Sequence, residues 1–183
     1  ARGMQDRSVA VIGDSTFMHS GVTGLVNIGY NKGNSTVIIL DNRITGMTGH
    51  QDNPTTGRTL KGEEVPQVSI EAVCRAAGIR RVRVVDPYDT VQVETALKEE
   101  LASPEPSVII SRRPCVLLKS VPKKAPLAVD REQCRSCKAC FKIGCPSIHM
   151  EDSKASIDPT LCVGCGLCAS LCPFHAIGAQ EVR

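Results

Sequence analysis

Two runs near the end of the 183-residue chain read Cys134-x-x-Cys137-x-x-Cys140-x4-Cys145-Pro146 and Cys162-x-x-Cys165-x-x-Cys168-x3-Cys172-Pro173. Each run sets three cysteines at steps of three and then a fourth cysteine directly before a proline. The repetition marks this part of the chain as an internal duplication. Bound metal would draw such closely spaced thiols together, so these two runs decide how the last third of the chain folds.

The spacing of both runs is typical of bacterial ferredoxins that hold two [4Fe-4S] clusters, with one extra residue in the first run. In that pattern the three closely spaced thiolates bind one cluster, and the fourth cysteine of the run binds the other. The predicted ligands of one cluster are Cys134, Cys137, Cys140 and Cys172, and those of the second are Cys162, Cys165, Cys168 and Cys145. Gly144, Gly164 and Gly166 allow the tight turns in which backbone N–H groups point at the cluster sulfides.

Two other uses of cysteine fit these runs less well. Structural zinc is bound by two pairs of ligands spaced as Cys-x-x-Cys, whereas each run here begins with a triplet. Disulfides need an oxidising compartment, and the first residues do not resemble a signal peptide. Ten cysteines in such a chain therefore indicate a reducing cytoplasm. Outside the runs, Cys74 is interpreted as a buried core thiol, and Cys115 is an alternative candidate for a redox thiol.

Upstream of the runs, short aliphatic segments alternate with helical patterns. The predicted strands are 8–12, 35–40, 82–85 and 107–110, and the predicted helices are 16–30, 70–77 and 90–101. Ser69 and Asp89 are placed as N-caps of the second and third helices. This alternation predicts an α/β domain with a parallel sheet. The Thr- and Gly-rich stretch 43–66 is long for a loop in a compact domain, so it is expected to be functional or disordered.

The chain therefore divides into an α/β domain at 1–118, an exposed linker at 119–127 and a small α+β module at 128–183. The module is expected to hold both clusters and to form short strands at 147–150 and 156–158. A net charge of +3 is too small to indicate nucleic acid, and no apolar run is long enough to span a membrane. No methionine stands at position 1, so the sequence is expected to be the C-terminal part of a longer protein.

A second constellation lies where the first predicted strand meets the first helix. Gly13-Asp14-Ser15 offers free backbone N–H groups and the positive end of a helix, which suit phosphate. Asn42 follows the next strand, and neighbouring parallel strands would bring it to the same sheet edge as Asp14. One or two carboxylates together with phosphate oxygens are usual ligands of Mg²⁺. The alternative is an ordinary helix cap.

These residues carry a resemblance to thiamine diphosphate enzymes, whose signature is commonly Gly-Asp-Gly followed by Asn-Asn. The sequence departs from that signature at Ser15 and Asp41. The resemblance implies that Asp14, Asn42 and the carbonyl of Ile44 hold Mg²⁺ against the diphosphate, and Asp41 is not expected to be a ligand. Gly13 and Ser15 would bind the cofactor as well.

The stretch Thr45-Gly46-Met47-Thr48-Gly49-His50-Gln51 resembles the Thr-Gly-Gly-Gln type of loop in 2-oxoacid:ferredoxin oxidoreductases. Together with the Arg112-Arg113-Pro114-Cys115 segment and the two cysteine runs, it is similar to the large subunit of the indolepyruvate ferredoxin oxidoreductase family. In this resemblance Thr48 and Gly49 contact the cofactor, and His50 is the candidate catalytic residue.

The resemblance implies an oxidoreductase that converts an aryl 2-oxoacid to an acyl-coenzyme A and passes electrons through two clusters to ferredoxin. A glutamate on a separate pyrimidine-binding domain activates the cofactor in such enzymes, and we find no such domain in this sequence. The chain alone is therefore expected to be inactive, with the remaining domains or subunits as its partners. An electron-transfer subunit whose α/β domain only docks partners is the alternative function. A non-oxidative thiamine enzyme fits less well, because it needs no exit for electrons.

Overall fold

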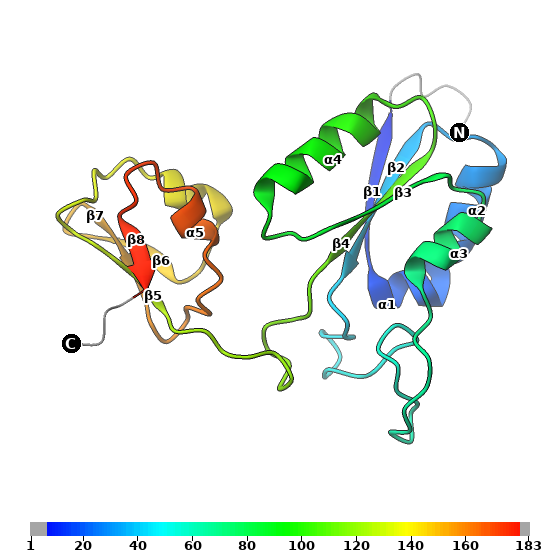
Figure 1. Ribbon diagram of the computed structural model, residues 1–183, viewed down its shortest axis with the longest axis horizontal. Coiled ribbons are helices and arrows are strands. Elements are labelled where there is room, and N and C mark those ends of the chain that lie inside the picture. Colours follow the sequence, from blue (N-terminus) through cyan, green and yellow to red (C-terminus); the bar gives the residue numbers. More distant parts are fainter. Residues whose placement is uncertain (1–6, 180–183) are drawn as a thin grey trace. The chain divides into compact units, whose positions relative to one another are not determined.

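The computed structural model describes residues 7–179, which fall into two compact units, and the chain passes from one to the other between Cys115 and Val116 (Figure 1). The predicted domain ranges 1–118 and 128–183 begin and end in residues outside this described part. None of the helices in residues 7–179 combines the length and the apolar character needed to cross a membrane.

The first unit is built on a parallel sheet of four strands. They are β1 (Ser8–Gly13), β2 (Ser35–Asp41), β3 (Arg81–Val85) and β4 (Ser107–Arg112), arranged in the order β1-β2-β4-β3. The two central strands are nearly continuous runs of Val and Ile, as expected of strands covered on both faces. The predicted α/β fold with a parallel sheet is confirmed.

Helices cover both faces of this sheet (Figure 1). One continuous helical segment comprises α1 (Asp14–Thr16), the π-helical turn η1 (Phe17–Gly21) and α2 (Val22–Tyr30). It packs with α3 (Ile70–Ala76) on one face, and α4 (Thr90–Ala102) lies on the other. The helical segment begins two residues earlier than predicted and contains a π turn that the sequence pattern did not reveal. This early start brings Asp14 into the first helical turn.

Residues alternate between the two faces along the buried strands. Val37 and Ile39 of β2 pack with Leu25 of α2 and Ile70 of α3, whereas Ile109 of β4 packs with Ala96 of α4. The cysteine in α3, Cys74, is fully buried in the larger core, and burial raises the pKa of its thiol to about 12. Cys74 is therefore a packing residue.

Two of the helix starts are fixed as the sequence predicted. The hydroxyl of Ser69 accepts a hydrogen bond from the backbone N–H of Ala72 at 3.1 Å. The carboxylate of Asp89 accepts one from the backbone N–H of Gln92 at 2.9 Å. Each cap satisfies an N–H group that has no partner inside the helix.

The second unit contains two small antiparallel sheets and two short helices. Strand β5 (Leu127–Val129) pairs with β8 (Ile177–Ala179), and β6 (Ile148–Glu151) pairs with β7 (Lys154–Ile157). The helices are η2 (Ala139–Ile143) and α5 (Leu167–Ser170), one in each cysteine run. The predicted strands 147–150 and 156–158 are displaced by one to two residues, and Leu127 of the predicted linker belongs to β5.

The hairpin between β6 and β7 explains this displacement. Asp152 and Ser153 both have positive φ, 45° and 62°, which two-residue hairpin turns require. The turn therefore starts directly after Glu151, and Lys154 becomes the first residue of β7. Apolar and polar residues alternate over 148–151 and over 154–157, so the sequence indicates two strands but does not fix where each of them ends.

Candidate functional site

The first candidate site lies at the carboxyl edge of the parallel sheet. Gly13 ends β1 and pairs in register with Leu40 of β2, so Asp14 and Asn42 leave the same edge on neighbouring strands. A Cβ atom added at Gly13 would meet no atom within 4 Å, and the backbone there is ordinary extended chain with φ −75°. The described chain therefore leaves open space over the start of the helical segment, as a diphosphate approaching backbone N–H groups would need.

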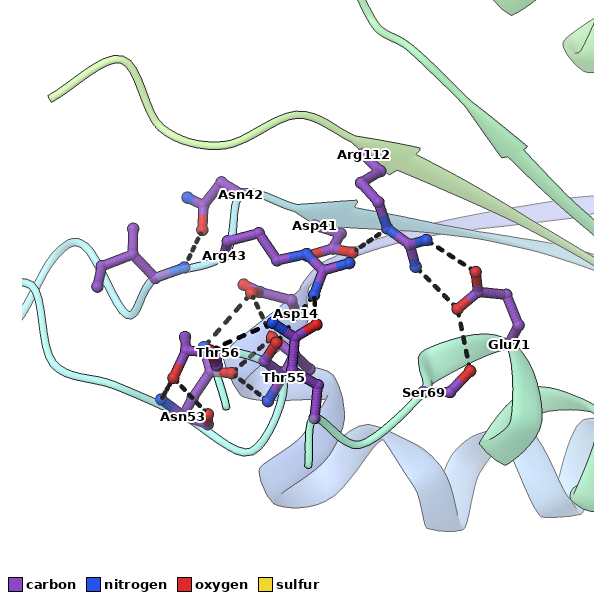
Figure 2. A network of polar contacts seen from close by, with 12 residues as sticks. Asp14, Asp41, Asn42, Arg43, Asn53, Thr55, Thr56, Ser69, Glu71 and Arg112 are labelled. Atoms are coloured by element: carbon purple, nitrogen blue, oxygen red, sulfur yellow. Dashed lines mark hydrogen bonds and ion pairs between the residues drawn. The ribbon is translucent and has the colours of Figure 1, made fainter. Parts of the chain in front are cut away.

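Asp14 is buried at this edge, with only 2% of its surface exposed. Its Oδ2 atom lies 3.3 Å from Nδ2 of Asn53 and 3.3 Å from Oγ1 of Thr55 (Figure 2). Burial raises the pKa of the Asp14 carboxyl, and hydrogen bonds from the backbone of Ser15 and from Asn53 and Thr55 oppose that rise. The two side-chain donors reach the same oxygen, Oδ2, and the backbone of Ser15 also hydrogen-bonds the carboxylate.

Asn42 is exposed and lies on the chain directly after β2. Its side-chain Oδ1 accepts a hydrogen bond from the backbone N–H of Ile44 at 3.1 Å, and its own carbonyl accepts one from Cys115 at 3.0 Å. Within residues 7–179 no hydrogen bond joins Asn42 or Ile44 to Asp14. The amide oxygen retains a second lone pair, which suits a cation at the same edge.

The predicted cofactor loop forms a closed turn. Thr45 and Gln51 exchange two backbone hydrogen bonds, at 3.0 and 3.2 Å, and the hydroxyl of Thr45 donates to Ser15 at 2.9 Å. Thr48, Gly49 and His50 lie at the exposed tip, where Gly49 and His50 have φ of 113° and 63°. The base of the turn therefore contacts the Asp14 segment, and the tip that carries His50 projects away from these contacts.

The sequence interpretation missed the rest of the polar network. The guanidinium of Arg43 donates to the carbonyl of Thr55 at 2.9 Å and to Oε1 of Gln67 at 2.7 Å, and it lies 3.3 Å from Asp41. These contacts fold the 43–66 stretch back onto the sheet edge, so it is an ordered loop in the structure (Figure 2). No short-range sequence pattern pairs Arg43 with residues 12 and 24 positions away.

A second ion-pair cluster lies at the ends of β2 and β4. Arg112, at the end of β4, donates to Asp41 at 2.6 Å and to both oxygens of Glu71 at 2.8 Å (Figure 2). The hydrogen bonds from Arg112 lower the pKa of Glu71 to about 2. Asp41 therefore forms ion pairs with both Arg112 and Arg43.

In the second unit, four cysteines from both runs line one cavity. We call this the first cluster site: it comprises Cys134, Cys137, Cys140 and Cys172. The wall of the cavity also includes Phe141, Met150 and Ile177. Burial first, and then the negative charge of Cys137, Cys172 and Cys134, raises the pKa of Cys140. Cys172 thus lies with the triplet of the other run.

The remaining cysteines of the runs form what we call the second cluster site, namely Cys162, Cys165, Cys168 and Cys145. Burial, followed by the charges of Cys165 and Cys162, raises the pKa of Cys168 to about 11. Cys145 packs against the hydrophobic core that cysteines of both runs share, and its sulfur lies 3.0 Å from the hydroxyl of Ser147. Raised thiol pKa values would be reversed by iron, because a coordinating thiol is deprotonated.

Comparison with known families finds a match in each of the two units. Residues 1–111 match the family model of the thiamine pyrophosphate enzyme, C-terminal TPP binding domain. This chain belongs to the thiamine pyrophosphate enzymes. Residues 155–178 match the 4Fe-4S binding domain, and this region contains three cysteines of the second cluster site together with Cys172. A thiamine pyrophosphate domain is thus followed on one chain by an iron–sulfur domain.

The resemblance to the indolepyruvate oxidoreductases is confirmed over nearly the whole chain. The indolepyruvate oxidoreductase subunit IorA of Pyrococcus horikoshii is 44% identical over 184 residues, with 96% of this chain and 28% of that protein covered. The IorA subunit of Methanothermobacter marburgensis is 40% identical over 178 residues, with 97% and 29% covered. This chain therefore spans less than a third of the length of these relatives.

Proposed function

We propose that this chain is the part of an indolepyruvate-type 2-oxoacid:ferredoxin oxidoreductase that binds the diphosphate of the thiamine cofactor and conducts electrons away from it. The observation that carries the proposal is that a candidate metal-diphosphate site and a candidate iron–sulfur site occur on one chain. The first unit has an Asp–Asn sheet edge of the kind that holds a metal diphosphate, and the second has a cavity lined by four cysteines. Neither site alone would link decarboxylation to an iron–sulfur electron acceptor.

At the sheet edge, Asp14, Asn42 and the carbonyl of Ile44 are assigned to Mg²⁺. Gly13 and Ser15 would hold the diphosphate through backbone N–H groups at the start of the helical segment. We assign Thr48 and Gly49 to binding of the cofactor and His50 to contact with the substrate. This assignment requires the exposed tip of the turn to contact both molecules when they are bound. Thiamine diphosphate, when bound, supplies the carbanion that attacks the carbonyl carbon of a 2-oxoacid.

In the second unit, the eight cysteines of the two cluster sites are assigned to two [4Fe-4S] clusters. Each cluster accepts one electron, so the pair matches the two electrons released when a 2-oxoacid is oxidised to an acyl group. The remaining parts of the enzyme would supply the pyrimidine-binding domain, and coenzyme A and ferredoxin would take the acyl group and the electrons. The relatives' name supports indolepyruvate as the 2-oxoacid.

The test is anaerobic EPR spectroscopy of the complete enzyme without dithionite. Addition of indolepyruvate, coenzyme A, thiamine diphosphate and Mg²⁺ is expected to produce reduced-cluster signals, and omission of the thiamine cofactor is expected to remove them. A complete enzyme that binds no thiamine diphosphate but still exchanges electrons with ferredoxin would support the alternative, in which the α/β unit only docks partners.

Thr55 gives a finer test of the magnesium assignment. Its hydroxyl is buried and lies 3.3 Å from the same Asp14 oxygen that Asn53 contacts. Replacing Thr55 with valine keeps the shape but removes a hydroxyl that contacts Asp14 and, at 2.7 Å, Oδ1 of Asn53, the other residue that contacts Asp14. Loss of a residue that orients a metal ligand typically costs 10–100-fold in metal affinity. We expect the Mg²⁺ concentration for half-maximal binding of thiamine diphosphate to rise by about 10-fold.

The matched control is Thr55→Ser, which retains the hydroxyl and is expected to stay close to the wild-type value. Calorimetric titration of the complete apoenzyme at several Mg²⁺ concentrations measures both variants. If Thr55→Val keeps the wild-type Mg²⁺ requirement, then Thr55 only packs the loop and does not orient Asp14.

A further inference from the structure

The two cluster sites differ in the charges that surround them. Between its first and last cysteines, the first run contains Arg135, Lys138 and Lys142 and no acidic residue, whereas the second run contains no charged residue at all. An aspartate occupies the same position before each run, four residues ahead of its first cysteine. Asp130 and Asp158 each accept a backbone hydrogen bond from the cysteine four positions later, at 3.0 and 3.1 Å. The two runs are therefore alike in these turns and differ in the cations that they contain. Lys124, which lies outside the second run, is next to Gly164 of that run.

One further cation lies against the first run. Nζ of Lys154, the first residue of β7, donates to the carbonyl of Cys134 at 2.8 Å and to the carbonyl of Arg131 at 2.9 Å. The side chain is partly buried, and within residues 7–179 no carboxylate forms an ion pair with it. Arg131, in contrast, lies 3.2 Å from both Glu151 and Asp152, so its charge is balanced.

An unpaired ammonium group at this position changes the energy of a cluster more than an exposed lysine would. A [4Fe-4S] cluster with four thiolates is negatively charged, and reduction adds one more negative charge. A nearby cation therefore stabilises the reduced form more than the oxidised form, and burial protects this attraction from screening by salt. Net charge around a cluster is one of the factors that set its reduction potential.

We propose that Lys154 raises the reduction potential of the cluster in the first cluster site above that of the cluster in the second, an inference that rests on the two-cluster function proposed above. An electron on the reduced second cluster then passes to the oxidised first cluster without any other reactant. At equilibrium a single electron in the module therefore occupies the cluster of the first cluster site before it leaves the module. Lys154 acts through the field at Cys134 and is a tuning residue, not a ligand.

The experiment is a potentiometric titration of the complete enzyme, followed by EPR, with Lys154→Gln compared against the wild type. Glutamine keeps a hydrogen-bond donor but removes the charge. The expected result is that the more positive of the two midpoint potentials falls while the more negative one is unchanged. Lys154→Arg keeps the charge and is expected to leave both potentials near the wild-type values. Lys142→Gln, at an exposed lysine of the same run, is expected to shift the potential less.

Iron analysis accompanies each sample, so that loss of a cluster is not mistaken for a change in potential. If the wild type holds two clusters and Lys154→Gln has the same two midpoint potentials as the wild type, the inference is overturned and the proposed function stays intact. A shift confined to the more negative potential would also overturn it. Fewer than two clusters in the wild type would refute the two-cluster function itself. If Lys154→Gln loses iron, then Lys154→Arg decides, because a purely charge-based role predicts that it restores the wild-type potential.

Discussion

Replacing Asp14 with asparagine in the complete enzyme is expected to abolish Mg²⁺-dependent binding of thiamine diphosphate. Asp14 is the only acidic residue that the sheet edge is proposed to offer to the metal, and Mg²⁺ depends on carboxylate charge to give up its water. Changes to residues that merely orient a metal ligand cost 10–100-fold, so loss of the ligand's charge should cost at least about 100-fold in affinity. Calorimetric titration of thiamine diphosphate with and without Mg²⁺ measures the effect.

The matched control is Asp52→Asn, which changes an exposed acidic residue in the 43–66 loop. It changes the net charge by the same amount and is expected to bind the cofactor like the wild type. Iron content should be unaffected in both variants, because Asp14 and the cysteine runs lie in separate units. If Asp14→Asn retains wild-type affinity at low Mg²⁺ concentration, the magnesium assignment is wrong and Asp14 is only a buried cap of the helical segment.

The position of this edge could be predicted from the sequence because it depends on strand order alone. Aliphatic runs marked β1 and β2, and parallel pairing of neighbours in the chain brought the residues after them to one edge. The support for Asp14 could not be predicted in the same way. Asn53 and Thr55 lie 39 and 41 positions away in a loop without periodicity, and their placement depends on how Arg43 folds that loop.

The cysteine module shows the same division between local and long-range information. The two triplets follow from local spacing, and the predicted iron–sulfur domain is confirmed by the family match at 155–178. The pairing of β5 with β8 was not predicted, because three-residue strands show no recognisable alternation. That pairing joins the start of the module to the segment after Cys172, and the backbone N–H of Ala176 donates to the Cys172 sulfur at 3.4 Å.

Replacing Cys172 with alanine is expected to destroy the cluster of the first cluster site, although Cys172 belongs to the second run. The cavity that contains Cys172 is lined by Cys134, Cys137 and Cys140, and none of the other three cysteines of its own run lines it. Iron content should fall from about eight to about four atoms per chain if the damaged cluster is lost. Conversion to a three-iron cluster would instead leave about seven atoms and a distinct EPR signal.

The assignment is tested by comparing EPR spectra of four single variants of the complete enzyme. Cys172→Ala should resemble Cys140→Ala, and Cys145→Ala should resemble Cys168→Ala, because each pair would remove ligands from one cluster. The opposite grouping, in which Cys172→Ala resembles Cys168→Ala, would show that each run binds its own cluster. Crossed ligation has a structural consequence that local ligation lacks: each cluster then ties the two halves of the duplication together. Loss of Cys172 should therefore also loosen β8 from β5, and faster amide hydrogen exchange at Leu127–Val129 would report it.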